Sequence, residues 1–426
     1  MILTESQEIG KNKILSFLQG PDREMRITGA AGHGKTTMLR FALQDHLLKN
    51  PYDSIIGITV SHKAKAILGN SIPSVATFAK AYGYKEKIVG DKRIFEPDPF
   101  KIANALCKND NKCFIIDECS MFSQEMLDIL YKETSIFTKF IFVGDKNQLP
   151  PIVSNVDRGL DSPVFYMNLS ENLSHELTEV VRQEADNPIV FVANEIAKEI
   201  QGSCNLNNII ALLNKEHLKD GVGIHVLPKH MIHFHYNENY SNDLLNNKII
   251  GYRNNIIAAH NNTLRNLIYK NPQTKIIKGE VIFFNDTYMN ENDNVMIENS
   301  SEYIIEDVMI TNVDQIKSYM IYVNDNGSTK RFPIPTEDGE ADYRQACEIL
   351  YSDKKYKQYW DFKQQFANIS PSFAITSYKS QGSTYKNVYI DLSDMLSDRI
   401  PISPKRRLQS LYTSLTRAKY NCYIAI

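Results

Sequence analysis

Short apolar runs, each followed by glycine or polar residues, recur through the first third of the chain. The run from Met25 to Thr28 precedes the segment GAAGHGKT, and a helix-like run from Thr37 to Leu48 follows it. Two more apolar runs begin the segments CFIIDECSM at 113–121 and IFVGDKNQLPP at 141–151. Buried strands that alternate with helical segments predict a parallel sheet covered by helices. In such sheets ligands bind beyond the carboxyl ends of the strands, so the polar residues at these three ends are candidate site residues.

The second half of the chain predicts another α/β unit, interrupted by a β-rich insertion. Residues 245–269 have the pattern of a strand, a turn and a helix, and the segments KNVYIDLS and NCYIAI have that of short buried strands. Between them, the runs VIFFNDTY, NVMIENSSEYIIEDVMI and SYMIYV are separated by Asn, Asp and Gly, which predicts a small β-barrel. In the first unit, alternating apolar residues around Gly90 and Asp91 predict a β-hairpin within 85–100.

Composition removes several alternatives without choosing a function. The 426 residues suffice for roughly two to four domains, and the hydrophobic fraction of 42% is that of an ordinary globular protein. The six cysteines include no CxxC pair, which argues against a disulfide framework and a zinc ribbon. With a formal net charge of -2, any nucleic-acid site must be a local basic patch. No apolar run approaches the length of a membrane span and the first residues lack the order of a signal peptide, so we expect a cytoplasmic protein without a membrane partner.

The segment GAAGHGKT fits the phosphate-loop pattern G-x-x-x-x-G-K-[ST]. Its glycines allow backbone N–H groups to wrap a phosphate, and the following helix points the positive end of its dipole at the anion. Lys35 is expected to reach the β- and γ-phosphates, and Thr36 to ligate Mg²⁺. A glycine-rich turn that only joins a strand to a helix is the alternative, which the flanking run and helix disfavour. The candidate nucleotide-binding residues of this loop are Gly29, Ala30, Ala31, Gly32, His33, Gly34, Lys35, Thr36 and Thr37.

The next two strand ends supply the groups that nucleotide hydrolysis needs. Asp117 and Glu118 end the run CFII; Asp117 would hold Mg²⁺, and Glu118 would polarise the attacking water. Gln148 follows the third run and is suited to sensing the γ-phosphate or orienting water. Paired acids alone are as often a solvated turn, but after a phosphate loop they indicate hydrolysis of ATP with Mg²⁺. A kinase, a GTPase and a motor share these parts, so these residues do not choose among them.

Seven segments in a fixed order resemble the motifs of superfamily 1 helicases, namely GAAGHGKTT, TVSHKAKAIL, IIDECSM, GDKNQLPP, LTEVVRQ, ITSYKSQGST and LYTSLTRAK. The forms DECSM, GDKNQLPP and SYKSQGST are similar to the RecD/Dda branch, superfamily 1B, and the similarity runs along nearly the whole chain. It implies an α/β fold of two RecA-like P-loop domains in tandem, with ATP between them and single-stranded DNA across both. The implied domains are 1–172 with a pin hairpin inserted at 83–111, then 173–271 with 369–426, and an SH3-like accessory domain with a helical extension at 272–368.

The resemblance also assigns residues outside the phosphate loop to the ATP site. Arg182 in LTEVVRQ and Arg417 in LYTSLTRAK match motifs IV and VI, whose arginines reach the γ-phosphate from the second domain. Gln7 in LTESQ matches the glutamine that reads adenine, and Gly382 belongs to SYKSQGST. An isolated arginine on a helix is more often a solvated surface group, so only the motif context supports these roles. The implied catalytic residues are Lys35, Asp117, Glu118, Gln148, Arg182 and Arg417.

A track for single-stranded DNA is implied by the loops of the remaining motifs. Single strands are bound by donors that follow the backbone and by aromatic or apolar faces that stack on bases. Phe95, in the expected hairpin, matches the aromatic residue that would stack on the separating base pair; a surface hairpin with an incidental Phe is the alternative. The sequence departs from the family at Ala79 and Tyr378, where histidines are expected, although Tyr378 can still stack. The candidate DNA contacts are Ser61, His62, Lys63, Thr77, Phe78, Phe95, Pro150, Arg253, Asn254, Thr376, Tyr378, Lys379, Ser380 and Gln381.

These observations predict an ATP- and Mg²⁺-dependent DNA helicase that moves 5′ to 3′ and works as a monomer on single strands and on junctions with duplex. A single-strand-binding protein is a candidate partner, and the pattern is typical of phage proteins of replication or recombination. Two alternatives remain open. One is a translocase that strips proteins from DNA, or acts on RNA, without separating strands. The other is an ATP-switched DNA clamp or loader, which would hydrolyse ATP slowly.

Overall fold

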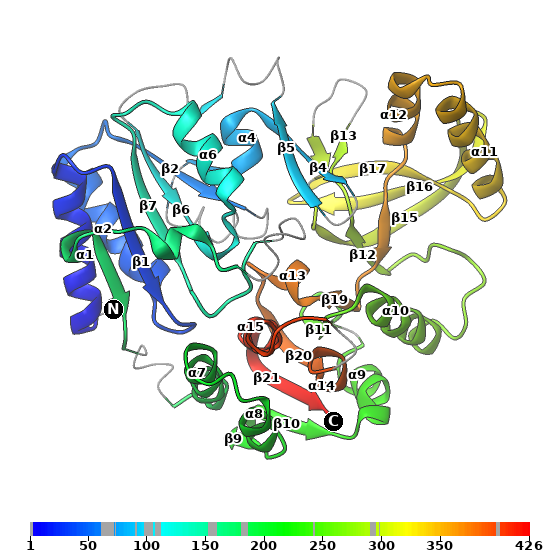
Figure 1. The fold of residues 1–426 in the computed structure, drawn as a ribbon. Helices are drawn as coiled ribbons and strands as arrows, with labels where there is room; N and C mark the ends of the chain where they lie inside the picture. The colour runs from blue at the N-terminus through cyan, green and yellow to red at the C-terminus, as the bar shows by residue number, and fades with distance from the viewer. Residues whose placement is uncertain are drawn as a thin grey trace.

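Two parallel α/β domains and a β-rich insertion make up the molecule in the computed structural model (Figure 1). In the view of Figure 1 the first domain lies at the left, the second at the bottom and the insertion at the upper right. The structure describes residues 3–60, 72, 74–89, 92–97, 105–106, 112–151, 160–179, 186–241, 243–289, 295–297, 299–397 and 401–426, with the backbone alone at 85–89, 92–95 and 295–296.

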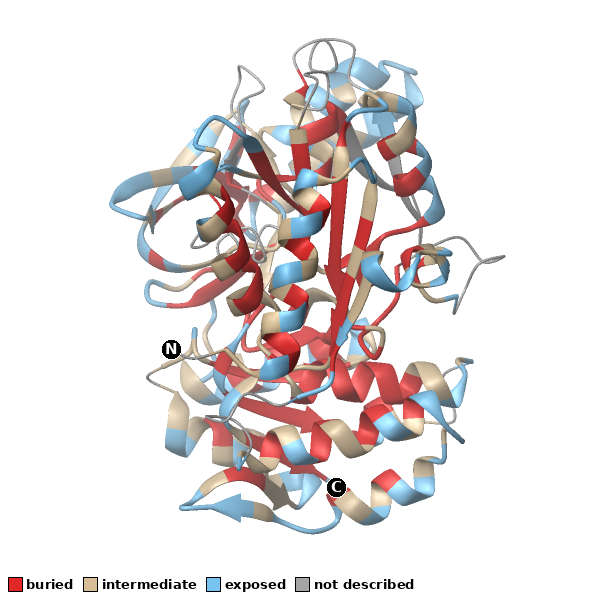
Figure 2. Cartoon of the chain, turned by 90° about the vertical axis from the view of Figure 1, so that its left-hand side faces the viewer, coloured by how far each residue is buried: buried red, intermediate tan, exposed pale blue. Residues whose placement is uncertain are grey.

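The first domain is a six-stranded parallel sheet with helices on both faces. Its strand order is β3 (Ser74–Thr77), β2 (Ser54–Thr59), β6 (Lys112–Ile116), β7 (Lys139–Gly144), β1 (Glu24–Gly29) and β8 (Ser174–Leu177). One face packs on α1 (Glu5–Gln19) and α2 (Lys35–Lys49), and the other on α4 (Phe78–Tyr82) and α6 (Gln124–Glu133). Both faces of β6 and β7 are therefore buried, which explains their unbroken apolar runs (Figure 2). The predicted parallel sheet is confirmed, and the ends of β6, β7 and β1 lie side by side.

The first domain extends beyond residue 172, where the sequence-based boundary falls. Strand β8 pairs in parallel with β1, so that Leu177 lies opposite Gly29. A four-residue strand at the edge of a sheet has too few positions to show a periodicity of its own. The prediction that the second domain begins at 173 is therefore wrong.

The second domain is a six-stranded sheet in which only β9 runs antiparallel. Its strand order is β19 (Ala374–Thr376), β11 (Asn247–Gly251), β20 (Tyr385–Asp391), β21 (Ala418–Ala425), β10 (Val222–Leu227) and β9 (His217–Lys219). Its helices are α7 (Pro188–Gln201), α8 (Leu206–Leu213), α9 (Ile232–Tyr240), α10 (Asn254–Ile268), α13 (Ser377–Ser380), α14 (Leu392–Met395) and α15 (Pro404–Leu415). The strand, turn and helix predicted within 245–269 are β11 and α10, and the two short strands predicted farther on are β20 and β21.

The insertion is a five-stranded antiparallel sheet with two helices. Its strand order is β17 (Ser328–Pro335), β16 (Ile316–Asp325), β15 (Glu302–Val313), β12 (Val281–Phe284) and β18 (Ile369–Pro371). The helices are α11 (Gly339–Ser352) and α12 (Tyr356–Gln364), as predicted for the extension; β13 (Tyr288–Met289) pairs with β14 (Val295–Ile297) beside them. Because β18 pairs with β12, the sheet ends at 371 and not at 368. The hairpin expected within 85–100 is present as β4 (Tyr84–Val89) and β5 (Lys92–Pro97).

Single-turn 3-10 helices complete the described secondary structure at Cys119–Met121, Pro163–Tyr166, Glu171–Leu173 and Lys229–Met231.

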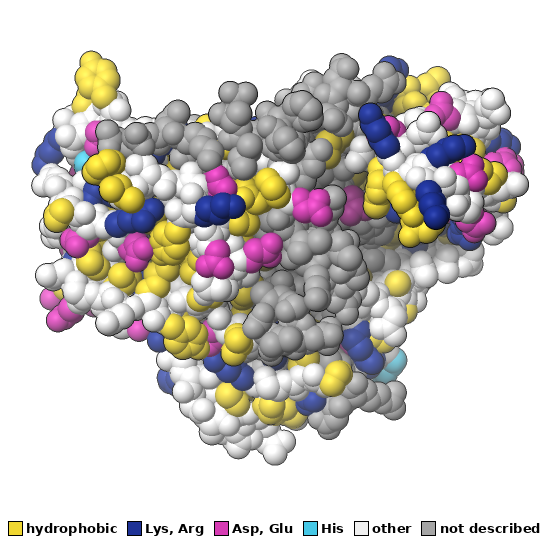
Figure 3. All heavy atoms as spheres, turned by 45° about the horizontal axis from the view of Figure 1, so that its top comes forward, with side chains coloured by type: hydrophobic (Ala, Val, Ile, Leu, Met, Phe, Trp, Pro, Cys, Tyr) yellow, Lys and Arg dark blue, Asp and Glu magenta, His cyan; other side chains and the backbone are white. Residues whose placement is uncertain are grey.

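On the face shown in Figure 3, hydrophobic and basic side chains lie together over the helical extension, at the upper right. On α12, Trp360 is half exposed, and the Lys363 ammonium lies 5.2 Å from the centre of its ring. None of the helices in the described ranges combines the length and apolar character that a membrane span requires.

A buried ion pair joins the insertion to the second domain. Lys248, on β11, is completely buried, and its ammonium lies 2.7 Å from Oε1 of Glu302, on β15. Glu302 also accepts hydrogen bonds from the hydroxyls of Ser372 and Tyr385. Burying two charges is offset only when they pair and when other donors satisfy the remaining lone pairs, and both conditions hold here.

Candidate functional site

The phosphate loop joins the end of β1 to the beginning of α2. Gly32 and Gly34 have φ angles of 79° and 70°, in the left-handed region that glycine adopts without strain. Gly34 caps α2 without a side-chain acceptor, so the first N–H groups of the helix remain available to an anion. The Lys35 ammonium donates to the carbonyl oxygens of Gly29 at 2.7 Å and Ala30 at 3.0 Å. The loop thus has the backbone donors and the cation that a phosphate chain requires.

Two acidic side chains stand at the end of β6, beside this loop. The N–H of Asp117 donates to the carbonyl of Ile58, and Asp117 Oδ1 accepts the N–H of Glu118 at 2.9 Å. Burial and the neighbouring Glu118 raise the pKa of Asp117, while Lys35 acts in the opposite direction. The adjacent carboxylates exceed the local positive charge, and carboxylate and hydroxyl oxygens are the ligands that Mg²⁺ prefers. The donor set of Asp117 and Thr36 therefore fits this ion.

The second domain contacts the phosphate loop directly through α15. The hydroxyl of Tyr412 accepts a hydrogen bond from the N–H of Ala31 at 2.8 Å and donates one to Asp145 Oδ2 at 2.6 Å. Tyr412 and Asp145 are both completely buried. The next residue of the helix, Thr413, accepts the N–H of Leu149 at 3.1 Å. Tyr412 lies in LYTSLTRAK but was not predicted as a site residue, because both of its partners are distant in the sequence.

Two amide side chains at this interface have buried oxygen atoms without a partner in the described part of the chain. Gln148, just beyond β7, is 5% exposed, and its Oε1 lacks a donor. Gln381 donates to the carbonyl of Leu149 across the interface at 3.1 Å, and its Oε1 likewise lacks a donor. Unsatisfied buried acceptors cost free energy and are rare unless a site uses them. Gln148 therefore keeps the predicted role in sensing a ligand.

The two predicted arginines have different outcomes. Arg182 lies outside the described residues. Arg417 is 7% exposed and donates to the carbonyls of Thr413 at 3.0 Å and Ser383 at 3.2 Å, and to the hydroxyl of Thr416. All three acceptors belong to the second domain, so the structure does not bring Arg417 to the phosphate loop. Gly382 lies at the same turn, with a φ angle of 73°.

Gln7 supports the phosphate loop from α1. Its Oε1 accepts the N–H of Thr4 at 3.0 Å, which completes a capping box at the beginning of the helix, and its Nε2 donates to the carbonyl of His33 at 3.1 Å. The side chain is 2% exposed. This contact gives Gln7 a structural role at the loop, and its reading of adenine stays a prediction.

A cavity of about 470 Å³ lies between the phosphate loop and α7. Ala30 and His33 line it from the loop, and Phe191 and Lys198 line it from the helix. Its size and its place between the domains suit part of a nucleotide. None of the α7 residues was predicted, because an ordinary amphipathic helix carries no motif that marks it as a ligand wall.

Two threonines occupy equivalent positions at the edges of the two sheets. Thr77 ends β3, and its hydroxyl accepts the N–H of Lys80 at the beginning of α4. Thr376 ends β19, and its hydroxyl accepts the N–H of Lys379 at the beginning of α13. The matching of the two turns supports the prediction that both belong to one track across the domains.

Six of the predicted DNA contacts are buried, namely Thr77, Phe78, Pro150, Thr376, Ser380 and Gln381. Phe78 is 1% exposed and stacks on Tyr82 with 4.7 Å between ring centroids. Ser380 is completely buried, and Pro150 and Gln381 are also buried at the domain interface. Solvent reaches these side chains little or not at all in this conformation, and their contact with DNA stays a prediction. Phe78 is the first residue of the short helix α4, and its ring lies in the core. The resemblance to the family's motifs does not show this burial.

The other predicted DNA contacts are partly exposed or lie outside the description. The Lys379 ammonium donates to Asn285 Oδ1 of the insertion at 2.9 Å, and the Arg406 guanidinium lies 5.3 Å from the centre of the Tyr378 ring. Arg253 begins α10, and the exposed Asn254 follows it. Outside the described side chains are Ser61, His62, Lys63 and Phe95.

The fold and the phosphate loop define a P-loop protein of two RecA-like α/β domains. Residues 6–217 match the family described as AAA domain, and 371–425 match the UvrD-like helicase C-terminal domain. The chain is 22% identical to the ATP-dependent DNA helicase dda of Enterobacteria phage T4, over 99% of this chain and 98% of that protein. It is 25% identical to the uncharacterized protein R530 of Acanthamoeba polyphaga mimivirus, over 97% of each. Together these matches support an ATP-hydrolysing DNA helicase that is similar to the Dda/RecD-like helicases of superfamily 1B.

A crystal structure of Pif1 helicase from Bacteroides, in complex with ADP-AlF3 and single-stranded DNA, has the same fold. It superimposes with a TM-score of 0.52 at 17% identity, over 99% of this chain and 92% of that one. The correspondence covers both RecA-like domains, so the tandem arrangement predicted from the motifs is confirmed.

Proposed function

We propose that this protein couples ATP hydrolysis to the unwinding of DNA and that it moves 5′ to 3′ along a single strand. The observation that carries the proposal is the contact of Tyr412, from the second domain, with the phosphate loop of the first. A ligand that enters this loop must compete with, or rearrange, a contact between two domains. Nucleotide state and domain separation are therefore linked at one point, which a motor requires and a simple phosphate-binding protein does not.

The ATP site works through residues of both domains. The N–H groups of the phosphate loop and the Lys35 ammonium bind the phosphates, while Thr36 and Asp117 would hold Mg²⁺. Bound Mg²⁺ would neutralise charge that develops on the phosphate oxygens. Glu118 orients the attacking water, and Gln148 senses the γ-phosphate. Arg417 must exchange its bonds to Thr413 and Ser383 for the phosphate, and this exchange makes its arrival depend on closure of the domains.

The DNA track follows the turns that begin at Thr77 in the first domain and at Thr376 in the second. Alternating grip at these two turns, as the domains close on ATP and open after hydrolysis, would move the strand past the β4–β5 hairpin. Phe95 of this hairpin is proposed to act on the base pair that separates. The T4 protein is named as a DNA helicase, and the Bacteroides Pif1 complex contains single-stranded DNA. Both facts favour DNA as the substrate.

The proposal extends to a monomer that acts with Mg²⁺ in the cytoplasm, with a single-strand-binding protein as a partner at the junction. The first test is strand separation, with ATP and Mg²⁺, of two matched duplexes with a single-stranded tail on the 5′ or the 3′ side. We expect unwinding of the 5′-tailed duplex alone. Unwinding of the 3′-tailed duplex alone would contradict the direction, and DNA-stimulated hydrolysis without unwinding would indicate a translocase.

The matched control is Glu118→Gln, which keeps the size of the side chain but removes the carboxylate. It should retain ATP binding, measured with a fluorescent analogue, and lose hydrolysis by several orders of magnitude. Lys35→Ala should lose both. Substantial turnover by the Glu118 variant would show that another group orients the water.

A further inference from the structure

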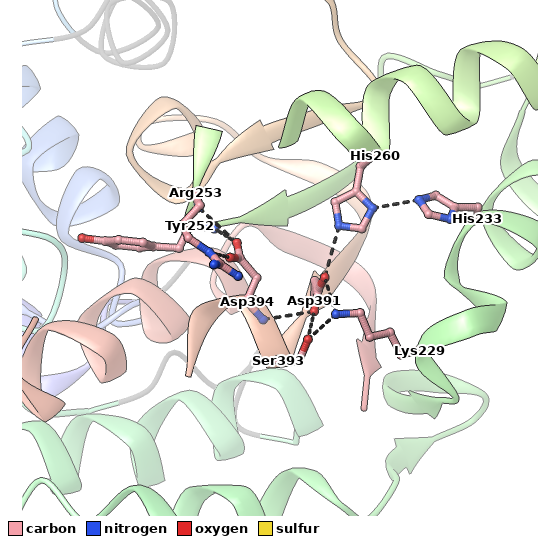
Figure 4. Close-up of polar contacts among 8 residues, drawn as sticks. All are labelled: Lys229, His233, Tyr252, Arg253, His260, Asp391, Ser393 and Asp394. Atoms are coloured by element: carbon pink, nitrogen blue, oxygen red, sulfur yellow. Dashed lines mark hydrogen bonds and ion pairs between the residues drawn. The ribbon is translucent and has the colours of Figure 1, made fainter. Parts of the chain in front are cut away.

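One buried carboxylate holds the turn between β11 and α10 and the arginine that follows it (Figure 4). Asp394, on α14, is 1% exposed. Its Oδ2 accepts the N–H groups of Tyr252 at 2.6 Å and Arg253 at 3.1 Å. Its Oδ1 accepts Nε of the Arg253 guanidinium, also at 2.6 Å. The carboxylate therefore fixes both the backbone and the side chain of the same residue.

The sequence provides room for this approach at Gly251. A Cβ atom at that position would lie 2.9 Å from Asp394 Oδ2 and 3.1 Å from Cδ1 of Ile257. Both distances are shorter than a carbon atom normally tolerates. A side chain at 251 would push the carboxylate away from the turn, so the glycine serves the contact and not an unusual backbone angle.

Asp394 is itself held in place by the other carboxylate of the same segment. Asp391 Oδ1 accepts the N–H of Asp394 at 3.1 Å and the hydroxyl of Ser393 at 2.8 Å. Its Oδ2 pairs with the Lys229 ammonium at 3.2 Å and with His260 Nε2 at 3.3 Å. Figure 4 shows these contacts as one connected set that ends at Arg253. The position of the Asp394 carboxylate is thus determined by β20, α10 and the 3-10 helix Lys229–Met231 together.

The rest of the Arg253 guanidinium is left for a ligand. The side chain is 32% exposed, and the described ranges show no acceptor for its two terminal nitrogens. Gly251 lies opposite Thr376 in the sheet, so the turn adjoins the DNA track proposed above. A guanidinium whose Nε is bound to a carboxylate has a restricted rotation, and its terminal nitrogens form the planar fork that suits phosphate oxygens.

We propose that Asp394 is a positioning residue that orients Arg253 toward a backbone phosphate of the bound single strand. The proposal rests on the proposed DNA-binding function of this chain and adds to it Asp394, which lies in none of the seven motif segments named above. Asp394 does not touch the strand; it acts by limiting the guanidinium to one orientation. Because the hydrogen bond to Asp394 already restricts the Arg253 side chain, Arg253 loses less conformational entropy when it binds phosphate.

The test is Asp394→Asn, measured by fluorescence anisotropy of a labelled oligo-dT at several salt concentrations. The amide oxygen can keep both backbone hydrogen bonds at the position of Oδ2, while the amide nitrogen replaces the acceptor of Arg253 Nε. We expect affinity to fall roughly tenfold, and the salt dependence of log K to decrease by up to about 0.7, the share of one phosphate on single strands. Arg253→Ala should show the full decrease, and adding Asp394→Asn to it should change neither quantity further.

The chain offers a matched control at the opposite end of α10. Arg265 Nε lies 2.6 Å from Oε1 of Glu280, which is also 1% exposed. Glu280→Gln removes the same kind of acceptor far from the proposed track, so it should leave DNA affinity and its salt dependence unchanged. Arg253→Lys, which keeps the wild-type Asp394, provides a second variant: it should bind like Asp394→Asn, because lysine has no Nε to be oriented.

The outcomes separate the two proposals. Equal losses from Asp394→Asn in the wild-type and Arg253→Ala backgrounds would show that Asp394 acts through general stability, and would overturn the positioning role. An Arg253→Ala variant with unchanged affinity and salt dependence would also overturn it, while DNA binding by the protein would stand. If the wild-type protein binds no DNA, the proposed function itself fails.

Discussion

Tyr412→Phe removes one oxygen atom from the contact between the two domains and leaves the buried ring in place. That oxygen links Ala31 of the phosphate loop to Asp145 at the end of β7. No atom of phenylalanine can accept from the first or donate to the second. We therefore expect the variant to weaken the contact between α15 and the first domain.

The free energy lost in Tyr412→Phe can be estimated from the hydrogen bonds that Asp145 keeps and the one that it loses. Asp145 is completely buried and keeps two hydrogen bonds, both to Oδ1, from the backbone and side-chain nitrogens of Asn147. Its Oδ2 loses the donor at 2.6 Å. A hydrogen bond to a charged group contributes about 1.5–3 kcal/mol. The equilibrium between joined and separated domains should thus shift by roughly tenfold to 150-fold.

Hydrogen exchange of the peptide that contains the phosphate loop measures the shift in the equilibrium between joined and separated domains, because the Ala31 N–H is the group that bonds to Tyr412. The N–H of Ala31 should exchange faster in Tyr412→Phe by the same factor, in the absence of nucleotide. Tyr240→Phe is the control, because it also removes one phenol oxygen, from a 2.7 Å contact with Tyr423 inside the second domain. Unchanged exchange at Ala31 in the Tyr412 variant, or an equal change in the control, would refute the reasoning.

The contact should not depend on pH in the physiological range. Burial, and after it Asp145, raise the pKa of Tyr412 well above its ordinary value. A raised pKa means that the folded protein holds the phenol proton more tightly than the unfolded chain does. The contribution is therefore complete below about pH 10 and is lost only above it. The difference in exchange between wild type and variant should be the same at pH 7 and at pH 9, after correction for the intrinsic rate.

Two further predictions concern stability. Lys248→Met leaves Glu302 buried without its cation and should cost about 3 kcal/mol, since breaking a buried pair is expensive and two hydroxyl donors remain. Urea unfolding measures this cost, and Lys278→Met, at an exposed pair, should cost almost nothing. Burial, and after it His260, lower the pKa of His233 to about 4. Because the unfolded chain binds this proton near pH 6.5, stability is lost as the pH falls from 6.5 toward 4, and His233→Gln should flatten that part of the profile of urea midpoint against pH.

The ATP site was largely predictable because its residues are near one another in the sequence. A glycine loop between a strand and a helix, and acids at the end of a buried strand, are local patterns with a single geometric meaning. The strand–helix unit β11–α10 was predictable for the same reason. The edge strand β8 was not, since its placement depends on pairing with β1 about 150 residues away.

Contacts between distant segments account for what sequence reasoning missed. Phe78 follows Thr77 of the predicted DNA track, yet its ring is buried against Tyr82 of the same helix and against Phe122. Asp394 lies 141 residues from Arg253, and nothing in the residues around either one marks the pair. Tyr412 lies in a recognised motif, but its role depends on contacts with Ala31 and Asp145 of the other domain, which the motif does not contain.

The path of the chain through the insertion sets limits on how the molecule can vary. The chain enters through β12 and leaves through β18, and these strands are paired, with Phe284 opposite Ile369. The segment between β12 and β18 therefore begins and ends at the same place in the structure. A short loop between these two strands could replace the segment without changing the path of the chain in the second domain. Such an exchange would remove Glu302, so a viable replacement must either carry a new anion to Lys248 or accept an apolar residue in place of that lysine.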